Sequence, residues 1–171
     1  MSEKLEHINQ AAKETVKADF LNCCGSQTWA RLMTEARPFA DVAALIKQAE
    51  QIWLNLDAQD WLEAFAAHPK IGARKAVLQQ SAQSAEWSNV EQSGTQTAAD
   101  SLRDELEKAN RLYEEKFGFI FIVCATGKSA EEMLDLCRGR LNNNADSEIR
   151  TAADEQKKIT KIRLKKLLEI E

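Results

Sequence analysis

Residues 41–56 read DVAALIKQAEQIWLNL, and this stretch decides the fold class. Its apolar residues recur at intervals of three and four positions, which places them on one face of an α-helix. The residues on this face are Val42, Leu45, Ile46, Ala49, Ile52, Trp53 and Leu56. Asp41 precedes them where a side-chain oxygen can cap the first turn. The pattern predicts an amphipathic helix with one face on a core.

The same periodicity appears on both sides of that helix. Upstream, the apolar positions of residues 29–36 follow Ser26, and they end at Arg37-Pro38 because the residue before a proline is disfavoured in the helical conformation. Downstream, a second pattern starts after Asp57 and ends in the same way at His68-Pro69. We therefore expect His68 at the C-terminus of a helix.

The second half of the chain contains three further helical patterns. Residues 102–117 are followed by Gly118, where a left-handed residue ends a helix. Ser129 and Glu132 form a capping box that opens the next helix. Asp146 is expected to open a long final helix that runs into a lysine-rich end. The chain is therefore predicted to be all-α.

One segment departs from the helical pattern. Residues 119–125 read FIFIVCA, a continuous apolar run between two glycines that favours a buried strand. The sequence offers no convincing second strand, and buried amides need partners. We expect an extended or half-helical segment whose backbone groups face a ligand. The predicted fold is an all-α, single-domain helical bundle over residues 1–171 with one short extended apolar segment.

Composition narrows the possible partners. A chain of 171 residues suits one domain with one core, and 44% hydrophobic with 29% charged residues is ordinary for a globular protein. The net charge of −4 disfavours nucleic acid and anionic lipid as partners. No apolar run is long enough to span a membrane. The four cysteines are interpreted as reduced, mostly buried thiols, so we expect a cytoplasmic protein.

The sequence lacks the common catalytic motifs, and this leaves one histidine as the candidate for acid–base chemistry. The sequence has no phosphate-binding glycine loop, no dinucleotide fingerprint, no serine elbow and no zinc helix. Of the two histidines, His7 lies in a charged N-terminal stretch, which leaves His68 as the candidate acid or base. A helix-terminal histidine can simply bond a carbonyl. However, proline at 69 and glycine at 72 would present this imidazole rigidly to a cavity, which suits a proton donor.

Two further groups have both a structural and a functional interpretation. Ser88 and Glu91 match a helix-capping box, with Ser88 as the N-cap. Alternatively, Glu91 and Gln92 offer a carboxylate and an amide that can pair with a urea-like group, while free amides of the first turn bind an anion. Arg163 lies in the lysine-rich final helix. The simpler interpretation is that it belongs to a solvated helix face, and the more specific one is that it binds a substrate carboxylate through two hydrogen bonds.

Taken in order, these motifs resemble one known family. An HPKIG motif at 68–72, an SxxEQ motif at 88–92 and an FGFIFIVCA run at 117–125 are similar to those of the OHCU decarboxylases of urate breakdown, where OHCU is 2-oxo-4-hydroxy-4-carboxy-5-ureidoimidazoline. The likeness extends from Asn9 to the tail at 159–168, and the HPKIG form is typical of bacterial members. The resemblance implies an all-helical, usually homodimeric enzyme. It needs no cofactor and no metal, and it converts OHCU to (S)-allantoin and CO2.

The resemblance also implies roles for particular residues. His68 becomes the proton donor, and Glu91 orients either His68 or the substrate hydroxyl. Gln92 pairs with the ureido arm, and amides of the apolar segment bind ring carbonyls. The implied substrate contacts are Pro69, Ser88, Asn89, Val90, Glu91, Gln92, Phe121, Ile122, Val123, Cys124, Ala125 and Arg163.

The implied chemistry fits the residues that are available. The electron pair left by the departing carboxylate can move into the neighbouring carbon–nitrogen double bond, so the substrate supplies its own electron sink. The protein must hold, orient and protonate the substrate, and histidine donates protons well near neutral pH. Two other interpretations stay open from the residues alone. One is a helical interaction module without a polar pocket beside His68, and the other is a different lyase or hydrolase on the same scaffold.

Overall fold

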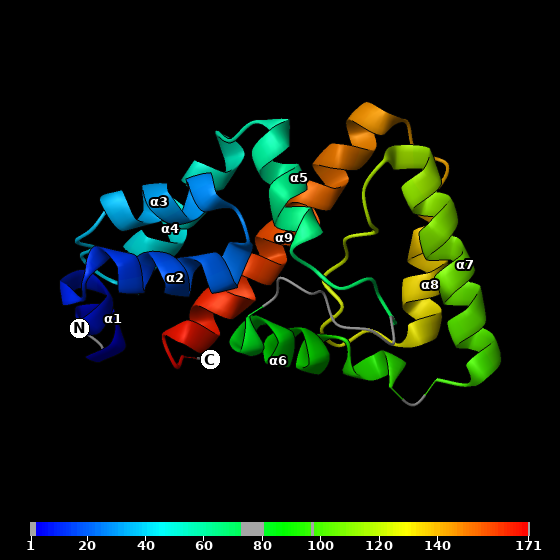
Figure 1. Cartoon of the computed structure of the whole chain (residues 1–171), viewed down its shortest axis with the longest axis horizontal. Coiled ribbons are helices and arrows are strands. Elements are labelled where there is room, and N and C mark those ends of the chain that lie inside the picture. Colours follow the sequence, from blue (N-terminus) through cyan, green and yellow to red (C-terminus); the bar gives the residue numbers. More distant parts are fainter. Residues whose placement is uncertain (1–2, 73–80, 97, 171) are drawn as a thin grey trace. The chain divides into compact units, whose positions relative to one another are not determined.

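The computed structural model describes residues 3–72, 81–96 and 98–170, and all regular secondary structure in these ranges is helical (Figure 1). The predicted all-α class is therefore confirmed. The described chain divides into two compact units, one formed by residues 1–64 and 157–171 and the other by residues 65–156. The expectation of one domain over residues 1–171 stays a prediction. None of the described helices is long and apolar enough to cross a membrane.

The first unit contains the helices around the opening sequence pattern. These are α1 (Glu3–Gln10), α2 (Lys13–Cys24), α3 (Gln27–Glu35), α4 (Val42–Leu54), most of α5 (Ala58–Ala66) and the last part of α9 (Ala145–Leu167). The predicted cap of α4 is present, because the Asp41 carboxylate accepts a hydrogen bond of 2.7 Å from the amide of Ala44. Ser26 caps α3 in the same way.

Trp29 forms the centre of the core of this unit. Its side chain is fully buried, and its ring packs edge-on against Phe20 with 5.9 Å between centroids. The indole Nε1 donates a 3.1 Å hydrogen bond to the carbonyl of Ala49, so the buried polar atom is satisfied. This bond ties α3 to α4 across the core.

The second unit contains the end of α5, α6 (Ala82–Glu91), the short 3-10 helix η1 (Ser93–Thr95), α7 (Asp100–Phe117), α8 (Ala130–Arg140) and the first part of α9. Gly118 ends α7 with φ of +78°, and Ser129 with Glu132 forms the predicted capping box of α8. Both expectations are confirmed. In Figure 1, α7 and α8 lie side by side and run in the same direction.

The path of the chain explains the extended segment. Because α7 and α8 run in the same direction, the connection between them must return along their length. Residues 120–125 make this return without helix or strand (Figure 1). An extended chain advances about 3.3 Å per residue against about 1.5 Å in a helix, so a few extended residues cover the distance. The predicted extended apolar segment is thus observed.

Two predicted helix starts are wrong. The α6 helix begins after Ser81, whose hydroxyl accepts from the amide of Ser84 at 3.0 Å, so Ser88 is not an N-cap. The sequence between these serines is compatible with helix, and the earlier cap opens the helix almost two turns sooner. The α9 helix begins at Ala145 because Asn144 supplies the cap, and Asp146 lies in the first turn.

Candidate active site

His68 lies directly after a helix end, as predicted. The α5 helix ends at Ala66, and the amide of His68 closes the last turn with a 3.1 Å bond to the carbonyl of Phe65. Pro69 follows and cannot continue the helix. The His68 side chain is buried, with 8% of the residue exposed. The imidazole is therefore largely shielded from bulk water.

The loop after His68 is held by side chains of α7 and by the residue that ends α6. Asn110 of α7 donates from Nδ2 to the carbonyl of Ile71 at 2.8 Å. Lys70 forms an ion pair of 2.5 Å with Glu114 of the same helix. Gly72 has φ of +72°, and a Cβ at this position would lie 3.1 Å from the side chain of Leu106. These contacts fix the loop that carries the histidine.

Gln92 uses both ends of its amide on the same loop. Its Oε1 accepts from the amide of Gly72 at 3.1 Å, and its Nε2 lies 3.5 Å from the carbonyl of Pro69. The second contact is long and weak. In the structure this amide holds the loop beside His68, and its expected pairing with the ureido arm of a substrate stays a prediction.

The end of α6 places the other residues of the SxxEQ motif on two faces. Ser88 and Glu91 are buried, while Asn89 and Val90 are exposed, Val90 to 61%. Because these residues form the last turn of α6, the free backbone groups there are carbonyls and not amides. The expected anion site on first-turn amides is therefore wrong for residues 88–92.

The extended segment is buried along residues 121–125, and charged side chains bind its backbone. Arg140 donates from Nη1 to the carbonyl of Ile122 at 2.7 Å. The amide of Cys124 donates to the carboxylate of Glu155 at 2.7 Å, and Lys128 donates from Nζ to the Cys124 carbonyl at 2.8 Å. The Cys124 amide is thus already bonded and does not face a ligand as we expected for this segment.

The three motifs come together within the second unit. Gln92 bonds the loop at 69–72, as described, and Phe65 packs against Phe119 with 5.4 Å between ring centroids. Burial raises the pKa of the Cys124 thiol, Lys128 opposes this shift, and the negative charges of Glu155 and Glu91 add to it. Glu91 is thus close enough to act electrostatically on Cys124. The ends of α5 and α6 and the extended segment form one candidate site.

Arg163 lies in the first unit and is buried, with 2% of the residue exposed. Its Nη1 donates to the carbonyl of Asn22 at 3.3 Å. Burial raises the pKa of the neighbouring Cys24 thiol to about 12, and the positive charge of Arg163 opposes that shift. The simpler interpretation of Arg163 as part of a solvated face is therefore wrong. Its role as a substrate ligand stays a prediction.

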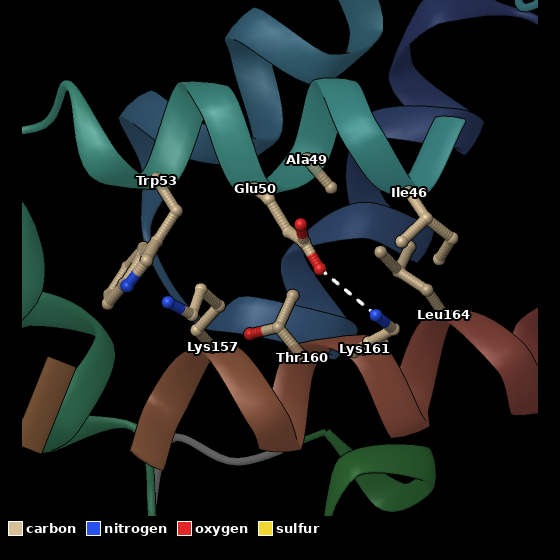
Figure 2. Close-up of a pocket in the computed structure, with 8 residues that line it drawn as sticks. All are labelled: Ile46, Ala49, Glu50, Trp53, Lys157, Thr160, Lys161 and Leu164. Atoms are coloured by element: carbon tan, nitrogen blue, oxygen red, sulfur yellow. Dashed lines mark hydrogen bonds and ion pairs between the residues drawn. The ribbon is translucent and has the colours of Figure 1, made fainter. Parts of the chain in front are cut away.

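The first unit also has a small pocket between α4 and the last part of α9. Figure 2 shows that α4 contributes one wall with Trp53, and that Lys157, Thr160 and Lys161 of α9 form the other. A 3.1 Å ion pair between Glu50 and Lys161 crosses it. This pocket contains none of the predicted site residues. In the described ranges, no group of three or more His, Cys, Asp or Glu side chains is arranged to hold a metal ion.

Sequence reasoning missed the buried polar residues that support the site. Arg140 follows Met133 and Cys137 at helical spacing, so it belongs to the buried face of α8. Asn110 lies between Leu106 and Tyr113 on the buried face of α7 in the same way. A polar residue on an otherwise apolar helix face was the available signal, because such a residue must find a partner inside the protein.

The fold and the site define an all-α chain in which the loop after a buried histidine, the end of a helix with a buried glutamate, and an extended apolar segment belong to one compact unit. The chain belongs to the OHCU decarboxylase family, whose model matches residues 9–165.

Two curated relatives and one solved structure illustrate the similarity. The chain is 39% identical over 168 residues to the uric acid degradation bifunctional protein TTL of Arabidopsis thaliana, covering 91% of this chain and 48% of that protein. It is 24% identical over 161 residues to a 2-oxo-4-hydroxy-4-carboxy-5-ureidoimidazoline decarboxylase of Haloferax volcanii, covering 94% and 93% of the two chains.

The crystal structure of an OHCU decarboxylase in the presence of (S)-allantoin aligns with a TM-score of 0.76 and 38% identity, covering 93% of this chain and 99% of that one. The chain spans about half the length of the Arabidopsis relative and about a third of a bifunctional relative from Bacillus sp. strain TB-90.

Proposed function

We propose that this chain catalyses the cofactor-independent decarboxylation of OHCU to (S)-allantoin and CO2 in urate breakdown. Membership of the OHCU decarboxylase family and the similar structure obtained with (S)-allantoin support this reaction. The observation that carries the proposal is that Gln92 of the SxxEQ motif bonds the loop after buried His68, while the neighbouring Glu91 acts electrostatically on Cys124 of the extended segment.

His68 is the proposed proton donor. When the bond between the ring carbon and the carboxylate breaks, CO2 leaves and the electron pair moves into the adjacent carbon–nitrogen double bond. The ring carbon that carries the ureido arm then takes up one proton, which creates the stereocentre of allantoin. The ring nitrogen of the former double bond also gains a proton, and the hydroxyl on the decarboxylated carbon loses its proton as that carbon becomes the ring carbonyl. A histidine on a fixed loop delivers this proton to one face only, and a positioned acid accelerates such a step about a hundredfold to ten-thousandfold.

The remaining site residues have proposed roles in binding. Glu91, buried and close to Cys124, orients the imidazole or the substrate hydroxyl. The side chains of residues 121–125 and Pro69 form the surface against the ring, and Arg163 pairs with the substrate carboxylate. Of the SxxEQ residues, Ser88 is buried, whereas exposed Asn89 and Val90 would contact substrate only from its outer side.

The proposal extends to assembly and location. We propose a homodimer, which the resemblance to the family implies, and a cytoplasmic location. All four cysteines are free thiols in the structure, which suits a reducing compartment. Light scattering coupled to size-exclusion chromatography measures the oligomeric state, and a monomer at micromolar concentration would contradict the dimer.

The test follows the handedness of the product. OHCU is generated freshly, and circular dichroism follows allantoin formation with native protein, His68→Ala and no protein. His7→Ala is the matched control, because His7 is the other histidine and is exposed on α1. We expect rapid formation of (S)-allantoin with the native and His7→Ala proteins, and a rate at least about a hundredfold lower with His68→Ala. Racemic product at the spontaneous rate with native protein would contradict the proposed function.

A further inference from the structure

Within the described ranges, the extended segment at residues 120–125 has no neighbouring strand to bond its backbone groups. Its backbone groups bind charged side chains in place of a neighbouring strand: Arg140 at the Ile122 carbonyl, and Glu155 and Lys128 at the two ends of the Cys124 residue. Each of these three bonds is 2.7 or 2.8 Å long. Bonds of this kind, with one ionised partner, are about twice as strong as neutral ones.

Arg140 is itself fixed by a buried cluster. Its Nε donates to a carboxylate oxygen of Glu148 at 2.7 Å, and its Nη2 forms an ion pair of 2.6 Å with the same oxygen. Nη2 donates to the hydroxyl of Tyr113 at 3.2 Å. The Tyr113 hydroxyl in turn donates to Glu148, and Asn143 donates to the other oxygen of that carboxylate. The guanidinium lies 4.7 Å from the centre of the Phe121 ring. Its position and orientation are therefore fully determined.

This arrangement requires an arginine. Two nitrogens of the guanidinium face Glu148, while the third nitrogen, Nη1, reaches the Ile122 carbonyl. A lysine ammonium is a single point charge and cannot hold both partners in a fixed geometry. An Arg140→Lys substitution would therefore remove the hydrogen bond to the Ile122 carbonyl, while most of the buried cluster around Glu148 persists.

Glu155 fixes the other end of the segment. It lies in the first part of α9, and its carboxylate holds the amide of Cys124, the residue on which Glu91 acts electrostatically. Arg140 of α8 and Glu155 of α9 thus form hydrogen bonds to the backbone of residues 122 and 124. The residue between them, Val123, is buried and must follow any displacement of either anchor.

We propose that Arg140 and Glu155 are positioning residues that set the shape of residues 121–125 as a substrate-binding surface. The inference rests on the proposed function, because that function makes this segment part of the binding site. The two side chains act through the backbone that they hold and do not touch the substrate. Their removal should therefore weaken ligand binding more than it slows the chemical step.

The test compares Arg140→Lys and Glu155→Ala with a matched control. Arg138→Lys is the control, because Arg138 lies on the same helix in a half-exposed ion pair with Glu105. Three quantities are measured: KM and kcat for OHCU, Kd for (S)-allantoin by calorimetry, and hydrogen–deuterium exchange in a peptide covering residues 119–127. Glu155→Ala removes the acceptor of the Cys124 amide at a half-buried position, and it serves as the second variant should Arg140→Lys fail to fold.

We expect each anchor variant to raise KM and Kd about tenfold to a hundredfold, with a smaller change in kcat, and to speed exchange in the segment. The control should change none of these. The native protein is assayed first, and its failure to decarboxylate OHCU would contradict the proposed function itself. With an active native protein, anchor variants that match the control in KM, Kd and exchange would overturn the positioning role.

Discussion

Replacing Glu148 by alanine should destabilise the second unit strongly. Glu148 is completely buried and neutralises the guanidinium of Arg140, which is itself 9% exposed. The substitution leaves that guanidinium inside the protein without its counter-charge, and it removes the acceptor of the Tyr113 hydroxyl. Breaking a buried pair from one side costs about 3–5 kcal/mol. For a chain of this length that corresponds to a fall in melting temperature of roughly 8–14 °C.

The assay is urea unfolding followed by far-ultraviolet circular dichroism, which gives the free energy of unfolding for each variant. Glu105→Ala is the control: it breaks the half-exposed pair with Arg138 and should cost less than about 1 kcal/mol. The double variant Arg140→Met with Glu148→Leu removes both charges and should recover at least half of the loss. If the double variant unfolds as readily as Glu148→Ala, the buried unpaired charge is not the cause of the instability.

Two further predictions concern close packing and alkaline stability. A Cβ on Gly94 would lie 2.1 Å from the carbonyl oxygen of Lys128, so Gly94→Ala should lower the free energy of unfolding, measured in urea, by about 1–3 kcal/mol. Gly139→Ala is the control, because a Cβ there would have nothing within 4 Å, and it should not lower that free energy. Equal stabilities of the two variants would contradict the close approach at Gly94. The pKa of Cys24 is raised by burial from its ordinary value of 9.0 to about 12, so the thiol ionises in the unfolded chain first. Its contribution to stability is therefore complete below pH 9 and is lost between pH 9 and about 12, by up to about 1.4 kcal/mol per pH unit. Melting curves across this range should fall less steeply for Cys24→Ala than for the native protein, and parallel curves would contradict the shift.

Local signals in the sequence were sufficient for most helices. Asp41, the capping box at Ser129 and the glycine at 118 act within one turn, so their effect on the chain is determined by a few neighbouring residues. The predicted helix start at Ser88 was wrong because a serine followed by glutamate three residues later is the pattern of a capping box but does not require one. The competing cap at Ser81 opens the helix earlier and turns the motif into its last turn.

The buried polar partners could not be predicted in the same way. The amphipathic pattern indicates that Arg140 lies on an inner face, but its partner Glu148 is on the next helix, and only the tertiary fold brings them together. The same holds for Arg163, whose lysine-rich surroundings resemble a solvated face although its side chain is buried against the carbonyl of Asn22. Burial of a charge depends on the whole fold, while the periodicity of a helix does not.

Two neighbouring residues at the end of α6 act on different parts of the candidate site. Gln92 holds the loop behind His68, while Glu91 acts on the extended segment at Cys124. Gln92 and Glu91 are consecutive residues, so the hydrogen bond to the histidine loop and the negative charge near Cys124 come from one turn of backbone. A displacement of the last turn of α6 would therefore change the surroundings of both the loop at 69–72 and the segment at 121–125 together.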